Sequence, residues 1–194
     1  MKKSFILASL LFGSVAFGDV CNDSLKFDFT FYGAPNKEYV VTKNTFIKFE
    51  SNFPDSKLLN ATLKIDATSL DTSADLSNIK ATWPAAMAKT RNTNTINQFF
   101  KKFENDPAVV EAKIVKIGED TIDVEFKMNG VTKVLPFKYE IKDNLLKASG
   151  KMDVLEFNTQ KAWESFQKVC EKVFHHGKSW SEIDINFEVD ASCK

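Results

Sequence analysis

Residues 183–190 read IDINFEVD, an unbroken alternation of apolar side chains with acidic or amide side chains. A period of two places successive side chains on opposite faces of a β-strand, so one face of this segment is apolar and the other is polar. The same alternation occurs in residues 25–31, which read LKFDFTF. Strands with one apolar face near both ends of the sequence predict an antiparallel sheet wrapped around an apolar interior.

Six further segments have strand character, so the predicted fold is all-β with helical inserts and about eight strands. Asn129-Gly130 separates two of these segments and predicts a two-residue hairpin turn, and Asp143-Asn144 predicts another turn. The six segments are residues 39–49, with a break at Lys43-Asn44, and residues 59–67, 110–117, 121–128, 131–141 and 145–154.

Three segments instead repeat apolar residues at spacings of three and four, which is typical of helices. They are residues 75–87, where Pro84 ends or kinks the helix, residues 96–103, and residues 159–174, with Thr159 as the N-cap. The apolar face of the last helix consists of Trp163, Phe166, Val169, Cys170 and Val173. Because each apolar face must be covered, we expect the last two segments to lie against the sheet or over the mouth of the barrel.

Residues 1–18 have the composition of a secretory signal peptide. Lys2 and Lys3 are followed by an apolar run, and Ala16 to Gly18 offer the small residues that precede a cleavage site. Residues 19–194 are then predicted to form a single exported domain without an integral membrane span. Removing Lys2 and Lys3 leaves 24 basic against 26 acidic side chains, so no basic surface for nucleic acid is expected.

Three cysteines lie in the predicted exported part, where disulfides persist. Cys21 precedes the first strand and Cys193 follows the last, so antiparallel pairing of these strands would bring the two thiols together. We therefore predict a Cys21–Cys193 disulfide, with Cys170 as the competing partner.

Common catalytic signatures are absent from the sequence, including the serine-hydrolase elbow, the zinc-protease helix motif and the phosphate-binding glycine loops. His175 and His176 follow the predicted helix 159–174, where a capping role next to the helix dipole is favoured over a metal site with Cys170. We predict no enzyme activity, no cofactor and no metal.

Several segments resemble the YceI family of periplasmic proteins, in the family's order along the chain. Residues 63–72, LKIDATSLDT, are similar to the family's "v-x-i-D-x-x-S-v-x-T" strand and turn. Residues 91–100, RNTNTINQFF, resemble its charged turn and "FF" helix, and residues 128–134, MNGVTKV, resemble its hairpin. Residues 150–157 correspond to its "R-x-D-F" strand but lack the arginine, and Asn92 replaces the aspartate after Arg91.

The resemblance implies a lipocalin-like antiparallel β-barrel in the periplasm. It also implies that the barrel holds an isoprenoid or another long-chain amphiphilic lipid, with a quinone as one such ligand. The oligomeric state is left open, and a homodimer is one alternative.

The apolar strand faces supply the candidate ligand contacts: Phe27, Phe29, Leu63, Ile65, Val124, Phe126, Phe137, Ile185 and Phe187. Small residues on inward faces favour a cavity over a filled core, because close packing would use larger side chains; these residues are Ala61, Ala67, Ala112, Ala148 and Gly150. The leading hypothesis is a periplasmic lipid carrier. The alternative is a non-enzymatic interaction or stress-response protein with a filled core.

Overall fold

A computed structural model describes residues 19–77 and 87–193. The predicted signal peptide, residues 1–18, lies outside the described residues, as does most of the predicted helix 75–87. Within the described residues, no helix combines the length and apolar character that crossing a membrane requires.

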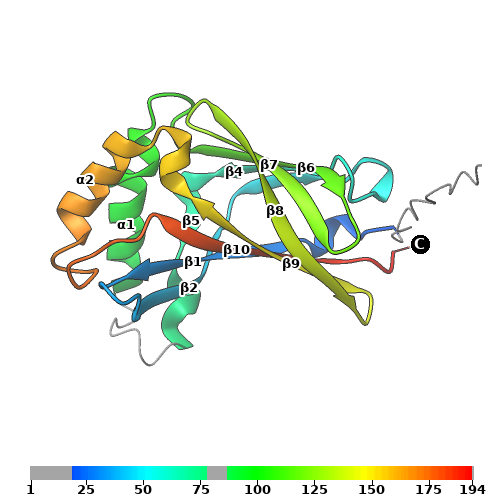
Figure 1. Cartoon of the computed structure of the whole chain (residues 1–194), viewed down its shortest axis with the longest axis horizontal. Helices are drawn as coiled ribbons and strands as arrows, with labels where there is room; N and C mark the ends of the chain where they lie inside the picture. Colours follow the sequence, from blue (N-terminus) through cyan, green and yellow to red (C-terminus); the bar gives the residue numbers. More distant parts are fainter. Residues whose placement is uncertain (1–18, 78–86, 194) are drawn as a thin grey trace, which may run out of the picture.

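Ten antiparallel strands form one curled sheet, in the order β3-β4-β6-β7-β8-β9-β10-β1-β2-β5 (Figure 1). The predicted antiparallel architecture is confirmed. The strands are β1 (Lys26–Gly33), β2 (Tyr39–Phe46), β3 (Phe49–Asn52), β4 (Thr62–Asp66), β5 (Leu70–Asp71), β6 (Val109–Ile117), β7 (Thr121–Met128), β8 (Val131–Lys142), β9 (Leu145–Asp153) and β10 (Glu182–Asp190).

The sheet has ten strands rather than about eight because two segments bend and each supplies two strands. The predicted strand 39–49 becomes β2 and continues past residue 49 as β3, and the predicted strand 59–67 becomes β4, with β5 following it at residues 70–71. Hydrogen bonds continue across the bend, from Ile47 N to Ser69 O at 3.1 Å and from Asp66 N to Lys48 O at 3.1 Å. The two terminal strands of the sheet, β3 and β5, therefore belong to one bent hairpin that closes the curled sheet.

The first and last strands of the domain are neighbours in the sheet. β10 pairs with β9 over nine residues, from Glu182↔Asp153 to Asp190↔Leu145. On its other edge it pairs with β1, where Phe27 lies opposite Phe187 and Phe29 opposite Ile185. Apolar side chains of the two segments that predicted the fold therefore share the inner face of the sheet.

The hairpin turns follow the predicted chemistry. Asn129 and Gly130 connect β7 to β8 with φ values of 49° and 77°, and Asp143 and Asn144 connect β8 to β9 with φ values of 52° and 64°. Two consecutive positive φ angles are what a two-residue turn needs to match the twist of the strands. Both predicted turns are confirmed.

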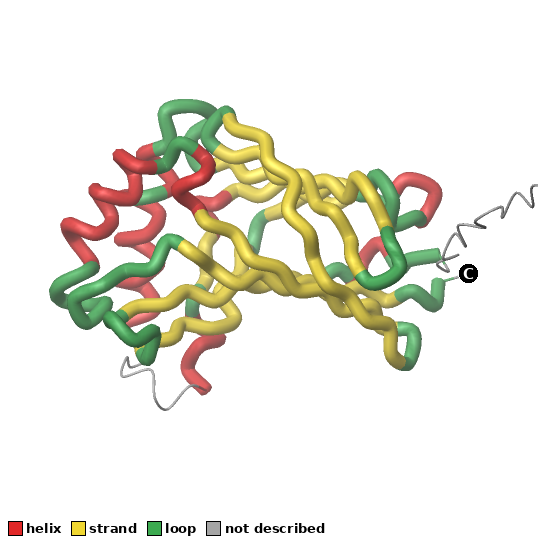
Figure 2. Tube along the Cα trace, in the orientation of Figure 1, coloured by secondary structure: helices red, strands yellow, loops and turns green. Residues whose placement is uncertain are grey.

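Two α-helices, α1 (Ala88–Gln98) and α2 (Gln160–Cys170), stand together at one end of the curled sheet (Figures 1 and 2). The helix predicted at 159–174 ends earlier, at Cys170, and Val169 and Val173 are 36% and 69% exposed instead of facing the core. Thr159 precedes the helix, but its hydroxyl donates to Val154 O at 2.7 Å and does not cap the helix. Short 3-10 turns complete the fold: η1 (Asn22–Ser24), η2 (Pro54–Ser56), η3 (Ala67–Ser69), η4 (Ser73–Ser77), η6 (Phe100–Lys102) and η7 (Val154–Phe157).

The predicted Cys21–Cys193 disulfide is confirmed, with a Cα–Cα distance of 5.2 Å, and Cys170 is a free, buried thiol. The C-terminus lies at the end of the sheet opposite the two helices (Figure 1). A backbone hydrogen bond from Cys21 N to Asp190 O at 2.9 Å joins the same two segments of the chain as the disulfide. The disulfide thus joins the ends of β1 and β10 at the end that the helices do not cover.

Replacing both bridged cysteines by serine should lower the free energy of unfolding. The bridge closes a loop with a sequence separation of 172 residues, which corresponds to roughly 4–5 kcal/mol in the chain-entropy model and to less where the unfolded chain keeps structure. Urea unfolding of Cys21→Ser/Cys193→Ser measures the loss, and Cys170→Ser, which keeps the bridge, is the control. An unchanged midpoint would show that strand pairing alone holds this end together.

Candidate functional site: an apolar cavity in the sheet

The curled sheet encloses a cavity of about 180 Å³ with an almost entirely apolar wall. Along β1 and the residue before it, the wall contains Leu25, Phe27, Phe29 and Phe31, which are alternate positions on one strand face. Seven residues of strand extend roughly 20 Å at about 3.3 Å per residue. The cavity is therefore long compared with its volume.

Several inward-facing side chains are incompletely buried. Phe29, Leu63 and Ala112 retain intermediate exposure although they lie on the inner face, whereas Val124 and Phe137 on the same face are 4% and 0% exposed. All five line the cavity. Part of the surface of the first three thus faces the cavity instead of a neighbouring side chain.

All nine candidate ligand-contact residues lie on this wall. They come from five different strands and are Phe27 and Phe29 on β1, Leu63 and Ile65 on β4, Val124 and Phe126 on β7, Phe137 on β8, and Ile185 and Phe187 on β10. The structure thus brings the predicted set together around one space. Their contact with a ligand remains a prediction.

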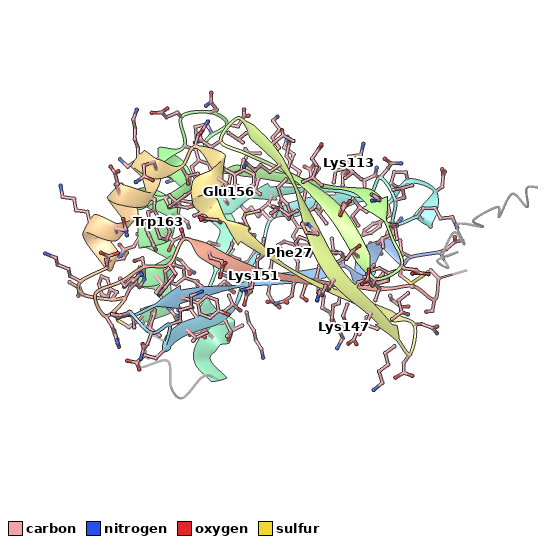
Figure 3. All side chains as sticks on the ribbon, in the orientation of Figure 1. Phe27, Lys113, Lys147, Lys151, Glu156 and Trp163 are labelled. Carbon is pink, nitrogen blue, oxygen red and sulfur yellow. A yellow bond between two sulfur atoms is a disulfide. The ribbon has the colours of Figure 1, made fainter. Side chains whose placement is uncertain are left out.

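The helices supply wall residues that the strand pattern did not include. Thr95 of α1, Phe99, and Trp163 and Phe166 of α2 close the helical end of the cavity. The ring centroids of Phe99 and Trp163 are 6.0 Å apart, and those of Trp163 and Phe166 are 5.4 Å apart. Trp163 lies at this helical end, and Phe27 lies farther along the sheet (Figure 3). As expected, the predicted helical segments 96–103 and 159–174 both lie at this end of the sheet. The first is not one helix, because it consists of the end of α1, which begins earlier at Ala88, and the 3-10 turn η6.

The small residues create space at only some of the predicted positions. Ala61 and Ala112 line the cavity. Gly150 does not leave space, because a Cβ atom there would lie 2.7 Å from the ring of Phe137, which packs over the glycine. Ala148 and Ala67 are buried, but they do not line the cavity. Space on an inward face therefore depends on which cross-strand neighbour can reach it.

His175 and Cys170 belong to the packing around α2. The His175 ring lies 4.7 Å from the Phe31 ring, and its Nδ1 is 2.8 Å from Ser179 Oγ. Burial lowers the pKa of His175 to about 4, so the ring is neutral at pH 7 and does not act as a charged helix cap. Burial also raises the pKa of the Cys170 thiol to about 11, which disfavours the reactive thiolate.

The described residues contain no group of three or more His, Cys, Asp or Glu side chains arranged to hold a metal ion. The cavity wall likewise offers no nucleophile paired with a base. What the arrangement provides is an enclosed apolar surface.

Comparison with known proteins gives partial likenesses. No family model matches the chain. Elongation factor P of Fusobacterium nucleatum is 33% identical over 88 residues, which cover 45% of this chain and 44% of that protein. The chain thus spans less than half the length of this relative, and the match assigns no family.

Three solved structures are similar over most of the chain. BcnA of Burkholderia cenocepacia is 16% identical, with 90% of this chain and 100% of that chain covered and a TM-score of 0.48. Two mutants of the CJ YCEI protein, one of them with a monobromobimane guest, are each 17% identical over 78% of this chain and 85% of theirs, with TM-scores of 0.46 and 0.47. With these identities and with TM-scores below 0.5, the likeness assigns neither a family nor a function.

Gly150→Ala should destabilise the protein by roughly 1–3 kcal/mol, because the added methyl group must displace the close-packed Phe137 ring. Thermal or urea unfolding measures the loss. The matched control is Ser149→Ala on the exposed face of the same strand, which should change stability by less than about 0.5 kcal/mol. If the two variants unfold alike, the space at Gly150 is open.

Proposed function

We propose that this protein is a YceI-like periplasmic carrier that holds an isoprenoid or another long-chain lipid in the cavity of its curled sheet, without catalysis. The observation that carries the proposal is the elongated apolar cavity, whose wall residues come from strands along the whole sheet and from both helices. A hydrocarbon chain buried there gains about 0.8 kcal/mol per methylene group. Affinity therefore requires little polar recognition.

The dimensions of the cavity favour a slender ligand. Its volume of about 180 Å³ is below the ~300–1,000 Å³ typical of pockets for compact drug-sized ligands, while its wall spans roughly 20 Å along β1. A single extended chain, acyl or prenyl, meets both conditions. A ligand with several bulky rings does not.

The cavity also distinguishes the carrier from the filled-core alternative. In a filled core the inward side chains would contact each other throughout, at the density of a molecular crystal. Here Phe29, Leu63 and Ala112 face free space. This favours a binding protein over an interaction protein that is merely well packed.

Two features support an exported carrier. The Cys21–Cys193 disulfide fits an oxidising compartment, where such bonds persist. Residues 1–18 have the composition of a signal peptide, and the exported part would carry a formal charge of −2 with no excess of basic side chains. A periplasmic location follows from both features together with the resemblance to YceI proteins.

Native mass spectrometry of the purified protein should detect a co-purified lipid in the wild type and much less of it in Ala112→Phe. The added ring extends from β6 into the space between Leu63 and Phe126, which lie opposite Ala112 on the two neighbouring strands. Lys64→Phe, on the exposed face of β4, is the matched control and should keep the lipid. Each variant is checked by its melting temperature.

Two outcomes would contradict the carrier. One is a wild-type protein that has no bound lipid and takes up none from added vesicles. The other is a well-folded Ala112→Phe variant that carries as much lipid as the wild type.

A further inference from the structure

A second, smaller chamber opens beside the helical end of the apolar cavity. It has a volume of about 60 Å³ and shares Phe29, Phe31, Thr95 and Phe166 with the wall of the main cavity. The rest of its wall differs in character because it contains polar side chains, among them Arg91 and Asn44. The chamber is thus a mostly apolar extension of the cavity that adds a few polar side chains at one end.

Arg91 is the only arginine in the chain, against 25 lysines, and it is nearly buried. Its side chain is 10% exposed, and Nη1 donates to Asp75 Oδ2 at 2.9 Å. Nε and Nη2 are buried and have no hydrogen-bond partner among the described residues. A guanidinium presents its N–H donors in a fixed planar fork, and Nε and Nη2 form one edge of it. This edge can donate hydrogen bonds to a ligand oxygen.

Two further buried polar atoms accompany the guanidinium. Asn44 is fixed by hydrogen bonds from its Nδ2 to Phe29 O and Val41 O, while its Oδ1 has no partner among the described residues. The Tyr39 hydroxyl lies close enough to Arg91 to interact with it, although no hydrogen bond of regular geometry joins the two. Burying such groups without a partner is costly, and native proteins have few of them. Arg91 and Asn44 both line the chamber, so their buried atoms without a partner point to a polar ligand group there.

The charges of the side chains around the chamber indicate which kind of polar ligand group it can hold. Asp75 is 1% exposed and already neutralises Arg91, and it also accepts a hydrogen bond from Thr42 N at 2.8 Å. His175, which lines the same chamber, is neutral at pH 7. The chamber therefore has free donors but no surplus positive charge. A carboxylate or phosphate would add an unbalanced buried charge, whereas a carbonyl or hydroxyl oxygen would not.

We propose that Arg91 receives the polar end of the bound chain, and that this end is an uncharged oxygen, a hydroxyl or a carbonyl. The inference rests on the proposed carrier function and adds the orientation of the ligand. The oxygen end lies under α1 and α2, and the hydrocarbon chain runs along β1 toward the end that carries the disulfide. Arg91 acts in recognition, while the apolar wall supplies most of the affinity.

The test compares the equilibrium binding of radiolabelled dodecane, dodecan-1-ol and dodecanoate at pH 7. In the wild type, dodecanol should bind at least tenfold more tightly than dodecanoate, because burial of the extra charge opposes the acid. Arg91→Lys keeps the charge that pairs with Asp75 but removes the planar fork. It should weaken dodecanol roughly tenfold, the value of a hydrogen bond to a charged donor, and leave dodecane unchanged.

A second variant removes both charges, Arg91→Met/Asp75→Asn, and should have the same selective effect if Arg91→Lys proves unstable. An equal loss of affinity for dodecane and dodecanol in the variants would mean that Arg91 only maintains the fold. Tighter binding of dodecanoate than of dodecanol by the wild type would contradict an uncharged end group. Either result leaves the carrier function intact. Failure of all three probes to bind the wild type would instead contradict the carrier itself and this inference with it.

Discussion

The antiparallel pairing of β1 with β10 is the contact on which the enclosed interior depends, because it joins the first strand of the domain to the last. Without it the remaining strands would form an open sheet with an exposed apolar face. Five residue pairs, from Lys26↔Glu188 to Thr30↔Asp184, hold this junction, and the Cys21–Cys193 disulfide lies just beyond it. Non-local pairing of this kind costs loop-closure entropy, and the covalent bridge offsets part of that cost.

The two ends of the interior are closed by different structures. At one end the apolar faces of α1 and α2 contribute aromatic rings, including Phe99 and Trp163. At the other end, the disulfide and the backbone hydrogen bond from Cys21 N to Asp190 O join the segment before β1 to the end of β10. The helices close one end with large side chains, while Ala61 and Ala112 on the sheet leave space that the larger neighbouring side chains do not fill.

The buried Arg91–Asp75 pair introduces polarity into an interior that is otherwise apolar. A guanidinium cannot lose its proton in a protein, so the charge persists even at 10% exposure, and Asp75 at 1% exposure must balance it. Such a pair is weak evidence for stability, because the desolvation of two charges offsets their attraction. Its position beside the apolar cavity fits the proposed role of Arg91 in recognition better than a role in stability.

The sequence by itself determined the antiparallel sheet, its hairpin turns, the disulfide and the nine strand residues on the cavity wall. All of these depend on local alternation and turn chemistry, or on the order of segments along the chain. Only the tertiary structure decided the rest. The bends that divide residues 39–52 and 62–71, the packing of Phe137 over Gly150, and the placement of Arg91 and Asn44 on one chamber wall all depend on which side chains are brought together across strands and helices. A period of two identifies the inner face of a strand, but it does not show which neighbour fills the space above that face.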